Sequence, residues 1–591
     1  MTTVIPAAFE TIPDGTQWPD PHTPALLNRD LRPGTDPAGL SRFCDDRWHL
    51  NQAVFEDHTK AICLNFATIS RALRQEVKFY VWQLLNHRGP MPMPWATSVR
   101  PAVSTVVVAF AQLKSFLTWL DSREVASLGE ITLPLLDDYL RDVADEEISL
   151  ELKYRKLAEV RRLWAYRTVL PSSMRLPAAP PWDGEDSREL FGRIRGTMDN
   201  RTRRIAERTM QLLLLWSIRF VDDFADDILA AHAEHLDLHT QTPDTRRRYG
   251  ITRDTQHWPG ELEAKVGAYL QTLRERGEAL PGKRDKDGVP VVDWRHLGRV
   301  LDSASFSQTR TGHLVRESGL PVGDYSPLDA PVTARLDGGP WLPGRIGFHQ
   351  APNMARLLTT ACFVIISYLS GARSGEVLNL RRGCIEHDRD NDLWLMSGLF
   401  FKNARNKDGS KAPAGETRRD PWVVVKVVAR AVGVLERLHP HQLLFPTRIE
   451  LYHRLEARTA EQRKGKARTD EMITTDLADF TGWVNDLCDR TGRTDHIPAD
   501  AYARLHPSRF RRTLAWFIRR RPRGLVAASI QYGHVHTRLL QGYAGSYASG
   551  FPDDYAFEDW LYRIERIAED EQALRDGEHV SGPPPTPTAG G

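Results

Sequence analysis

Six side chains in the C-terminal half of the sequence have the types needed to transfer a phosphoryl group. They are Arg373, Lys402, His506, Arg509, His534 and Tyr543. Two arginines can clamp the non-bridging oxygens of a pentacoordinate phosphorus, and histidines can donate hydrogen bonds or move protons near neutral pH. A lysine can protonate the departing oxygen, and a tyrosine can attack the phosphorus. Because these cations can replace a metal ion, we expect neither a metal nor another cofactor.

The spacing of these residues limits where they can lie. Arg373 follows "ACFVIISYLSG" (361–371), a stretch apolar enough to predict a buried helix, and Glu376 comes three residues later. A local ion pair at i,i+3 is one explanation of these two charges. A site is the other, because a charge at the end of a buried helix needs a partner or a function. His506 and Arg509 also stand at i,i+3, which would place them on one face if they open a helix.

Three stretches together resemble the tyrosine recombinase (phage integrase) family of site-specific DNA recombinases. They are "SGARSGEVLNL" (370–380), "HPSRFRRTLAW" (506–516) and "QYGHVHTRLLQGY" (531–543). In the last stretch Tyr543 follows His534 by nine residues. The resemblance covers roughly residues 346–547, and the helical pattern at 99–170 is similar to the core-binding domain of that family.

The resemblance implies a role for each residue of the first two stretches. Arg373 and Arg509 would hold the scissile phosphate, and His506 would assist proton transfer. Glu376 would orient Arg373 and the helix that carries it. The lysine of the following hairpin, Lys402, would be the general acid for the 5′-oxygen.

The third stretch would supply the nucleophile. Tyr543 would attack to give a 3′-phosphotyrosyl DNA and a free 5′-hydroxyl, and His534 would bond a non-bridging oxygen. Tyr547 is a rival nucleophile, although the plus-nine spacing favours Tyr543.

Two departures from the family pattern leave alternatives open. The hairpin carries the long insertion "KNARNKDGSKAPAGETRR" (402–419), so Lys407 or Lys411 could be the general acid in place of Lys402. In addition, Phe510 stands where the family more often has a histidine after the second arginine.

Charge is distributed unevenly, although the net charge is only +2. Eight arginines and no acidic residue lie between Arg504 and Arg523, whereas ten acidic residues and three arginines lie between Phe551 and Glu578. A basic segment of this kind predicts contact with a polyanion. The side chains expected to reach DNA phosphates are Arg511 and Arg512 in this segment and Lys153, Arg155, Lys156, Arg161 and Arg162 in "LKYRKLAEVRRLWAYR".

Length and composition set the fold class. A chain of 591 residues predicts several domains, and 41% hydrophobic with 26% charged residues is typical of globular proteins. Five scattered cysteines, no membrane-length apolar run and no secretory pattern favour the cytoplasm. The periodicity predicts a mainly α fold with a small antiparallel β-sheet or hairpin in the catalytic domain.

Breaker-rich segments and changes in periodicity divide the chain into five parts. We expect an N-terminal extension (1–95), a helical core-binding domain (96–180), a helical and loop-rich region without assigned role (181–345), a catalytic domain (346–550), and an acidic helix with a disordered tail (551–591). The acidic helix has apolar residues at helical spacing. It could pack on a neighbouring protomer or on its own catalytic domain.

These observations predict a site-specific recombinase that acts on double-stranded DNA. We expect a homotetramer on its sites and a monomer or weak oligomer when free, with accessory proteins as further partners. Integration or excision of a mobile element is the expected context. A type IB topoisomerase-like enzyme that nicks and reseals DNA is one alternative. A catalytically inactive DNA-binding accessory protein is the other, and the complete set of six residues argues against it.

Overall fold

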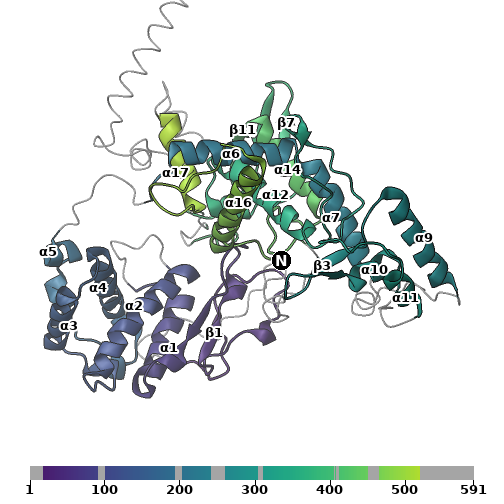
Figure 1. Cartoon of the computed structure of the whole chain (residues 1–591). Helices are drawn as coiled ribbons and strands as arrows, with labels where there is room; N and C mark the ends of the chain where they lie inside the picture. Colours follow the sequence, from purple (N-terminus) through teal and green to yellow (C-terminus); the bar gives the residue numbers. More distant parts are fainter. Residues whose placement is uncertain are drawn as a thin grey trace, which may run out of the picture.

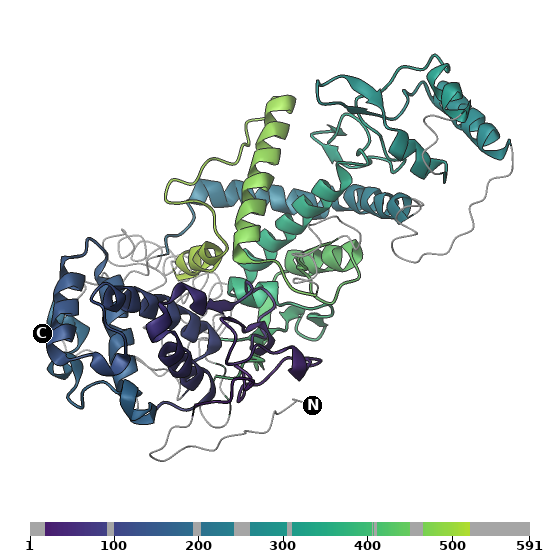
Figure 2. The same ribbon diagram turned by 90° about the horizontal axis from the view of Figure 1, so that it is seen from below.

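Helices make up most of the computed structural model, and its strands form small antiparallel sheets, in agreement with the expected fold class. The structure describes residues 18–90, 100–192, 202–240, 260–303, 310–402, 404, 406, 411–449 and 465–519. Three separate hydrophobic cores divide these residues into an N-terminal unit, a central unit and a small module. The N-terminal unit and the small module lie at opposite ends of the central unit (Figures 1 and 2).

The N-terminal unit has one continuous core that runs from Ala25 to Trp182. Its elements are β1 (Arg47–His49), β2 (Cys63–Asn65), α1 (Arg71–Asn86), α2 (Val103–Asp121), α3 (Leu133–Asp145), α4 (Leu150–Ala165) and α5 (Ser187–Phe191). The side chain of Thr132 accepts a hydrogen bond from the N–H of Leu135 and so starts α3 at the Leu-Pro pair. The boundary expected at residue 95 falls inside this core, because α1 packs against α2.

The central unit is built around α12, which contacts six other helices of the described chain. Its helices are α6 (Glu207–Asp222), α7 (Ala225–Thr240), α12 (Ala351–Ser370), α13 (Ser374–Leu378), α14 (Lys426–Leu438), α16 (Asp470–Thr491) and α17 (Ser508–Arg519). Both α2 and α12 are long and apolar enough in composition to cross a membrane. Most of α12 is buried among its neighbours, which makes it the core helix that the sequence predicts.

Two small sheets follow α13, where the sequence predicts strands. In the three-stranded sheet, β8 (Leu393–Met396) pairs with β7 (Ile385–Asp388) on one side and with β11 (Trp422–Val424) on the other. Two shorter strands, β9 (Leu399–Phe400) and β10 (Glu416–Thr417), form the base of the inserted hairpin. The insertion therefore extends from a sheet whose inner side chains, Met396 and Trp422, are buried in the central core.

The region expected at 181–345 is shared among all three units, because its first residues, with α5, belong to the N-terminal unit. Helices α6 and α7 pack on α12 and belong to the central core. The small module comprises α9 (Glu261–Arg276), β3 (Gly282–Arg284), β4 (Pro290–Val292), α10 (Trp294–Val300) and α11 (Arg310–Arg316), with a core of its own. A short hairpin of β5 (Arg335–Leu336) and β6 (Gly339–Pro340) leads back to α12.

Candidate functional site

The first predicted arginine lies in a tight turn between two helices. Helix α12 ends at Gly371, whose φ of 65° is the left-handed conformation that glycine adopts readily, and α13 begins after Arg373. Glu376 Oε2 accepts the backbone N–H of Arg373 at 2.7 Å, and its Oε1 accepts Nη1 at 2.7 Å. The Glu376 side chain is buried, whereas that of Arg373 is 29% exposed. The i,i+3 pair is therefore present and leaves the guanidinium accessible.

The second predicted arginine is fully engaged inside the protein. The Arg509 side chain is 4% exposed, and all five of its N–H groups donate to protein oxygens. Nε donates to the carbonyl of Arg203 at 3.0 Å, Nη1 to those of Ala503 and Arg504 at 2.6 and 2.9 Å, and Nη2 to the carbonyl of Arg204 at 2.6 Å and to Asp500 at 2.7 Å. These contacts leave no donor for a phosphate, so the clamp role expected of Arg509 does not fit its surroundings.

Asp500 completes this buried arrangement. Burial acts to raise the pKa of its carboxyl, but hydrogen bonds from Arg509 and from three backbone N–H groups outweigh burial and lower it. One of those groups belongs to Ala206, at the start of α6. Arg509 and Asp500 thus join α17 to the segment that leads into α6.

Arg511, in contrast, reaches the turn that holds Arg373. Its Nη1 donates to the carbonyl of Gly371 at 2.5 Å, two residues before Arg373. A helix turns by about 100° per residue, so residues two apart lie on nearly opposite faces. Arg509 and Arg511 therefore cannot face the same side. Arg511 was expected among the residues that contact DNA phosphates from the surface. Its burial and its contact with Gly371 place it beside the candidate site.

His506 lies just before α17 with a defined ring orientation. Its Nδ1 is 2.9 Å from Ser508 Oγ and accepts the backbone N–H of Ser508 at 3.3 Å. Because Nδ1 acts as an acceptor, we infer that the neutral ring carries its proton on Nε2. That proton is then available for a hydrogen bond to a ligand.

An open pocket of about 450 Å³ lies beside His506. The residues that line it are Lys60, Asp470, Glu471, Thr474, Arg504, Leu505 and His506. Ser374, the residue after Arg373, donates from its hydroxyl to Asp470 Oδ2 at 3.4 Å. The turn that holds Arg373 therefore contacts one of the residues that line the pocket beside His506.

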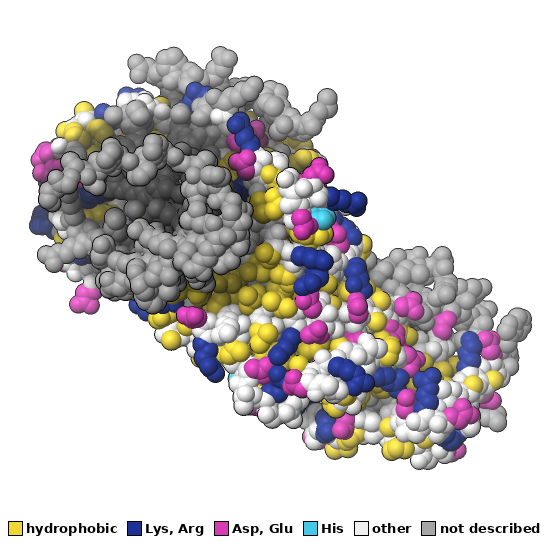
Figure 3. Space-filling model, turned by 90° about the horizontal axis from the view of Figure 1, so that it is seen from above, with side chains coloured by type: hydrophobic (Ala, Val, Ile, Leu, Met, Phe, Trp, Pro, Cys, Tyr) yellow, Lys and Arg dark blue, Asp and Glu magenta, His cyan; other side chains and the backbone are white. Residues whose placement is uncertain are grey.

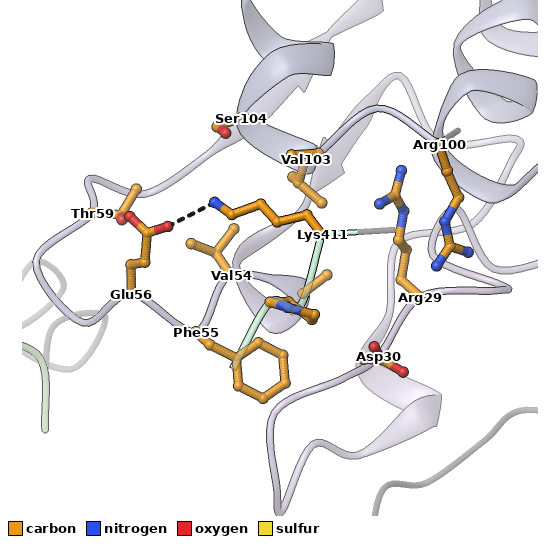
Figure 4. A pocket seen from close by; sticks show the side chains of 13 residues that line it. Arg29, Asp30, Val54, Phe55, Glu56, Thr59, Arg100, Val103, Ser104 and Lys411 are labelled. Carbon is orange, nitrogen blue, oxygen red and sulfur yellow. Dashed lines mark hydrogen bonds and ion pairs between the residues drawn. The ribbon is translucent and has the colours of Figure 1, made fainter. Parts of the chain in front are cut away.

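The lysines proposed as general acid have different surroundings. Lys402 is exposed and follows the buried Phe401 just after β9. Lys411 is 3.0 Å from Glu56 of the N-terminal unit, at the edge of a cavity that Arg29 and Arg100 also line (Figure 4). Lys411 thus forms an ion pair between two units, which is a structural role that needs no part in catalysis.

Arg418 is a further cation near Arg373, and it was not among the predicted site residues. Its guanidinium lies over the ring of Trp422 at 4.6 Å. Burial lowers the pKa of Arg418, with Glu376 opposing this shift and Arg373 adding to it. The "TRRD" at the end of the inserted hairpin was the only sequence signal for it.

The basic face predicted on α4 is largely occupied by internal contacts. Lys156 pairs with Glu146, and Arg162 with Glu159 at 2.9 Å. Burial raises the pKa of Glu159 to about 7, with Arg162 opposing this shift.

Three more arginines or lysines of this group are also engaged. Arg161 is buried, donates to Ser187 and lies over the ring of Trp182 at 4.8 Å. Arg155 pairs with Glu151, and Lys153 donates to the carbonyl of Ala144. All five cations of α4 that were expected to contact DNA phosphates are therefore engaged with groups of the protein.

The other predicted basic surface is also different from the expectation. Arg511 and Arg512 are 4% and 9% exposed, because α17 packs against α12. On the face in Figure 3, lysines and arginines are interspersed with acidic side chains over the described surface. Neither observation defines a continuous basic patch.

Several predicted residues lie outside the described residues: Lys407, His534, Tyr543, Tyr547 and the acidic segment 551–591. Within the described ranges, no group of three or more His, Cys, Asp or Glu side chains could hold a metal ion.

No protein-family model matches the sequence, and no curated protein matches it. Among solved structures, the chain is similar to XerA recombinase, with 14% identity, a TM-score of 0.20, and coverage of 56% of this chain and 98% of that one. It is also similar to XerH site-specific recombinase bound to difH substrate in a pre-cleavage complex, with 12% identity, a TM-score of 0.20, and coverage of 60% and 98%. At this TM-score the assignment of function rests on the residues themselves.

Proposed function

We propose that the protein is a site-specific DNA recombinase of the tyrosine type, which cleaves and rejoins strands through a 3′-phosphotyrosyl intermediate. Integration or excision of a mobile element in the cytoplasm is the proposed context. The proposed partners are double-stranded DNA and three further copies of the chain, which together handle two duplexes. Phosphotyrosine conserves the energy of the broken phosphodiester, so the reaction requires no nucleotide cofactor.

The observation that carries this proposal is the approach of two arginines to one turn. Arg373 is held by Glu376, and Arg511 donates to Gly371 in the same turn. His506 lies in the adjoining pocket. Two guanidinium groups at one turn and an imidazole N–H in the pocket beside it suit the spread negative charge of a phosphoryl-transfer transition state. In this proposal Arg511 takes the clamp role that the sequence first gave to Arg509.

Tyr543 and His534 complete the proposed machinery on the strength of their spacing. Tyr543 is the nucleophile, and His534 donates to a non-bridging oxygen. Lys402 is the proposed general acid, since Lys411 is engaged with Glu56.

Covalent adduct trapping tests the function. Wild type, Tyr543→Phe and the matched control Tyr547→Phe are incubated with DNA from the gene's own locus, quenched with detergent and digested for mass spectrometry. A nucleotide-linked peptide containing Tyr543, present in wild type and the control but absent from Tyr543→Phe, supports the proposal. Loss of the adduct in Tyr547→Phe instead reassigns the nucleophile.

The same samples separate the alternatives. Relaxation of supercoiled plasmid that lacks any special site favours a type IB topoisomerase. DNA binding without an adduct, on DNA that includes both ends of the element, favours an accessory DNA-binding protein.

A further inference from the structure

A five-residue segment of the N-terminal unit contacts the central unit with four of its side chains. We call this segment, residues 56–60, the strut. Its contacts are Glu56 with Lys411 at 3.0 Å, Asp57 with Arg381 at 3.2 Å and Lys466 at 3.6 Å, His58 with Asn379 at 2.9 Å, and Lys60 with Glu471. The strut therefore reaches the inserted hairpin, the residues after α13 and both the approach to α16 and its first turn.

Asp57 is the most buried residue of the strut. Its carboxylate is 3% exposed and accepts Arg32 of its own unit at 2.5 Å as well as Arg381. Its backbone N–H donates to Asn379 Oδ1 at 2.8 Å, and its carbonyl accepts the N–H of Ala467 at 3.0 Å. A buried carboxylate held by several opposite charges and two backbone hydrogen bonds fixes the strut against the central unit.

His58 lies directly against the helix that follows Arg373. The Asn379 amide nitrogen donates both to His58 Nδ1 and to the carbonyl of Gly375, the latter at 2.6 Å. A Cβ added to Gly375 would come within 2.7 Å of the His58 ring, so the imidazole fills the space above this glycine. Helix α13 has only five residues. A helix this short has little stability of its own and takes its orientation from its neighbours.

The last residue of the strut reaches the other half of the site. Lys60 lines the pocket that contains His506 and pairs there with Glu471 at the start of α16. One segment thus touches both the helix that follows Arg373 and the His506 pocket.

We propose that Asp57 and His58 are positioning residues, which hold α13 and thereby aim the Arg373 guanidinium at the scissile phosphate. This inference rests on the recombinase function proposed above. It makes the active arrangement of the central unit depend on the N-terminal unit, so that cleavage requires both units to be docked.

Hydrogen exchange of the DNA-free full chain tests whether Asp57 and His58 hold α13 in place. The variants are Asp57→Ala and the milder His58→Ala, with Asp46→Ala as the matched control. Asp46 pairs with Arg74 and Lys78 inside the N-terminal unit and has no contact with α13 among the described residues. We expect amides of peptides covering 373–381 to exchange about tenfold faster in both strut variants and at the wild-type rate in the control.

Cleavage of charged and neutral DNA linkages tests whether the strut acts on catalysis through Arg373. On the phosphodiester, we expect both strut variants to form adducts at least about tenfold more slowly than wild type, with unchanged DNA affinity. A methylphosphonate at the mapped cleavage position removes the charge that Arg373 neutralises. The difference between wild type and variants should therefore shrink on that linkage, as it should for Arg373→Ala.

The outcomes distinguish a failure of the strut proposal from a failure of the proposed recombinase function. Unchanged exchange across 373–381 overturns the strut proposal whatever the DNA result. An equal loss on charged and neutral linkages also overturns it, because a general structural defect would slow both. If the wild type forms no adduct, the recombinase function fails, and the exchange experiment still reports separately whether the strut holds α13.

Discussion

Glu376 caps the helix that Arg373 begins and holds the Arg373 guanidinium with its other oxygen, both at 2.7 Å. One buried carboxylate thus fixes the backbone and the side chain of the same arginine. We expect Glu376→Ala to destabilise the fold by about 2 kcal/mol, because it removes two hydrogen bonds, one of them to a charged group. Adduct formation should also fall.

Glu376→Gln is the matched variant, since it keeps one oxygen for the backbone N–H and loses the charge. Urea unfolding should show a destabilisation of about 1 kcal/mol or less for this change. If both variants unfold at the wild-type midpoint, the capping arrangement contributes nothing to stability.

Substitution of Arg509 should mainly lower stability, whereas substitution of Arg511 should mainly slow catalysis. Arg509→Ala leaves Asp500 buried without its partner, and we expect a loss of about 3–5 kcal/mol in the free energy of unfolding. Arg511→Lys keeps a charge but loses the planar fork, and we expect adduct formation to fall about a hundredfold while the unfolding midpoint shifts far less.

Thermal unfolding and adduct trapping on the same preparations check this pair of variants. A folded Arg509→Ala that forms no adduct, beside a fully active Arg511→Lys, would return the clamp role to Arg509.

The sequence predicted the helices and the hairpin well, because their patterns are local. Apolar periodicity identified α12, and the Thr-Leu-Pro start of α3 is a local capping signal. The local sequence pattern could not predict whether Arg509 or Arg511 lies beside the Arg373 turn. This depends on which side of α17 faces Gly371, and that is set by packing against α12.

Partners distant in sequence explain the other differences. Arg161 binds residues 24 and 26 positions away, so the basic pattern of α4 could not reveal that its charge was engaged. The strut depends on Asp57 meeting Asn379, 322 positions away, and no pattern within either stretch predicts that contact.

Lys402 and Lys411 should differ in their response to the leaving group. Lys411→Ala removes a half-exposed ion pair, so we expect a stability loss below about 1 kcal/mol and near wild-type cleavage. Lys402→Ala should slow cleavage about a hundredfold or more, because the 5′-oxygen then leaves unprotonated. A sulfur in place of that oxygen leaves as a thiolate without a general acid. Rescue of Lys402→Ala on the sulfur-substituted DNA, measured as the rate of adduct formation, would identify the acid, and rescue of Lys411→Ala instead would exchange the two roles.

Buried histidines should make the central unit sensitive to mild acid. Burial lowers the pKa of His232 and of His439 to about 4, from an ordinary value of 6.5. The unfolded chain therefore takes up protons below pH 6.5 that the folded chain refuses until about pH 4, and stability is lost as the pH falls through this window. From pH 7 to 5 we expect a loss of roughly 2 kcal/mol per histidine in the free energy of unfolding.

Urea unfolding at pH 7, 6 and 5 measures this slope, and His232→Phe isolates one contribution. Neither ring nitrogen of His232 has a hydrogen-bond partner among the described residues, so an apolar ring can replace it without leaving a polar group unpaired. Asp495 does not interfere, because its lowered pKa makes its contribution fade only below its unfolded pKa of 3.8. Glu159, whose pKa burial raises to about 7, makes a contribution that grows as the pH falls from 7 to 5, and this contribution is common to wild type and His232→Phe. We expect His232→Phe to flatten the slope and the exposed-site control His313→Ala to leave it unchanged. An identical slope in wild type and His232→Phe would show that His232 is already protonated in the folded chain at pH 5.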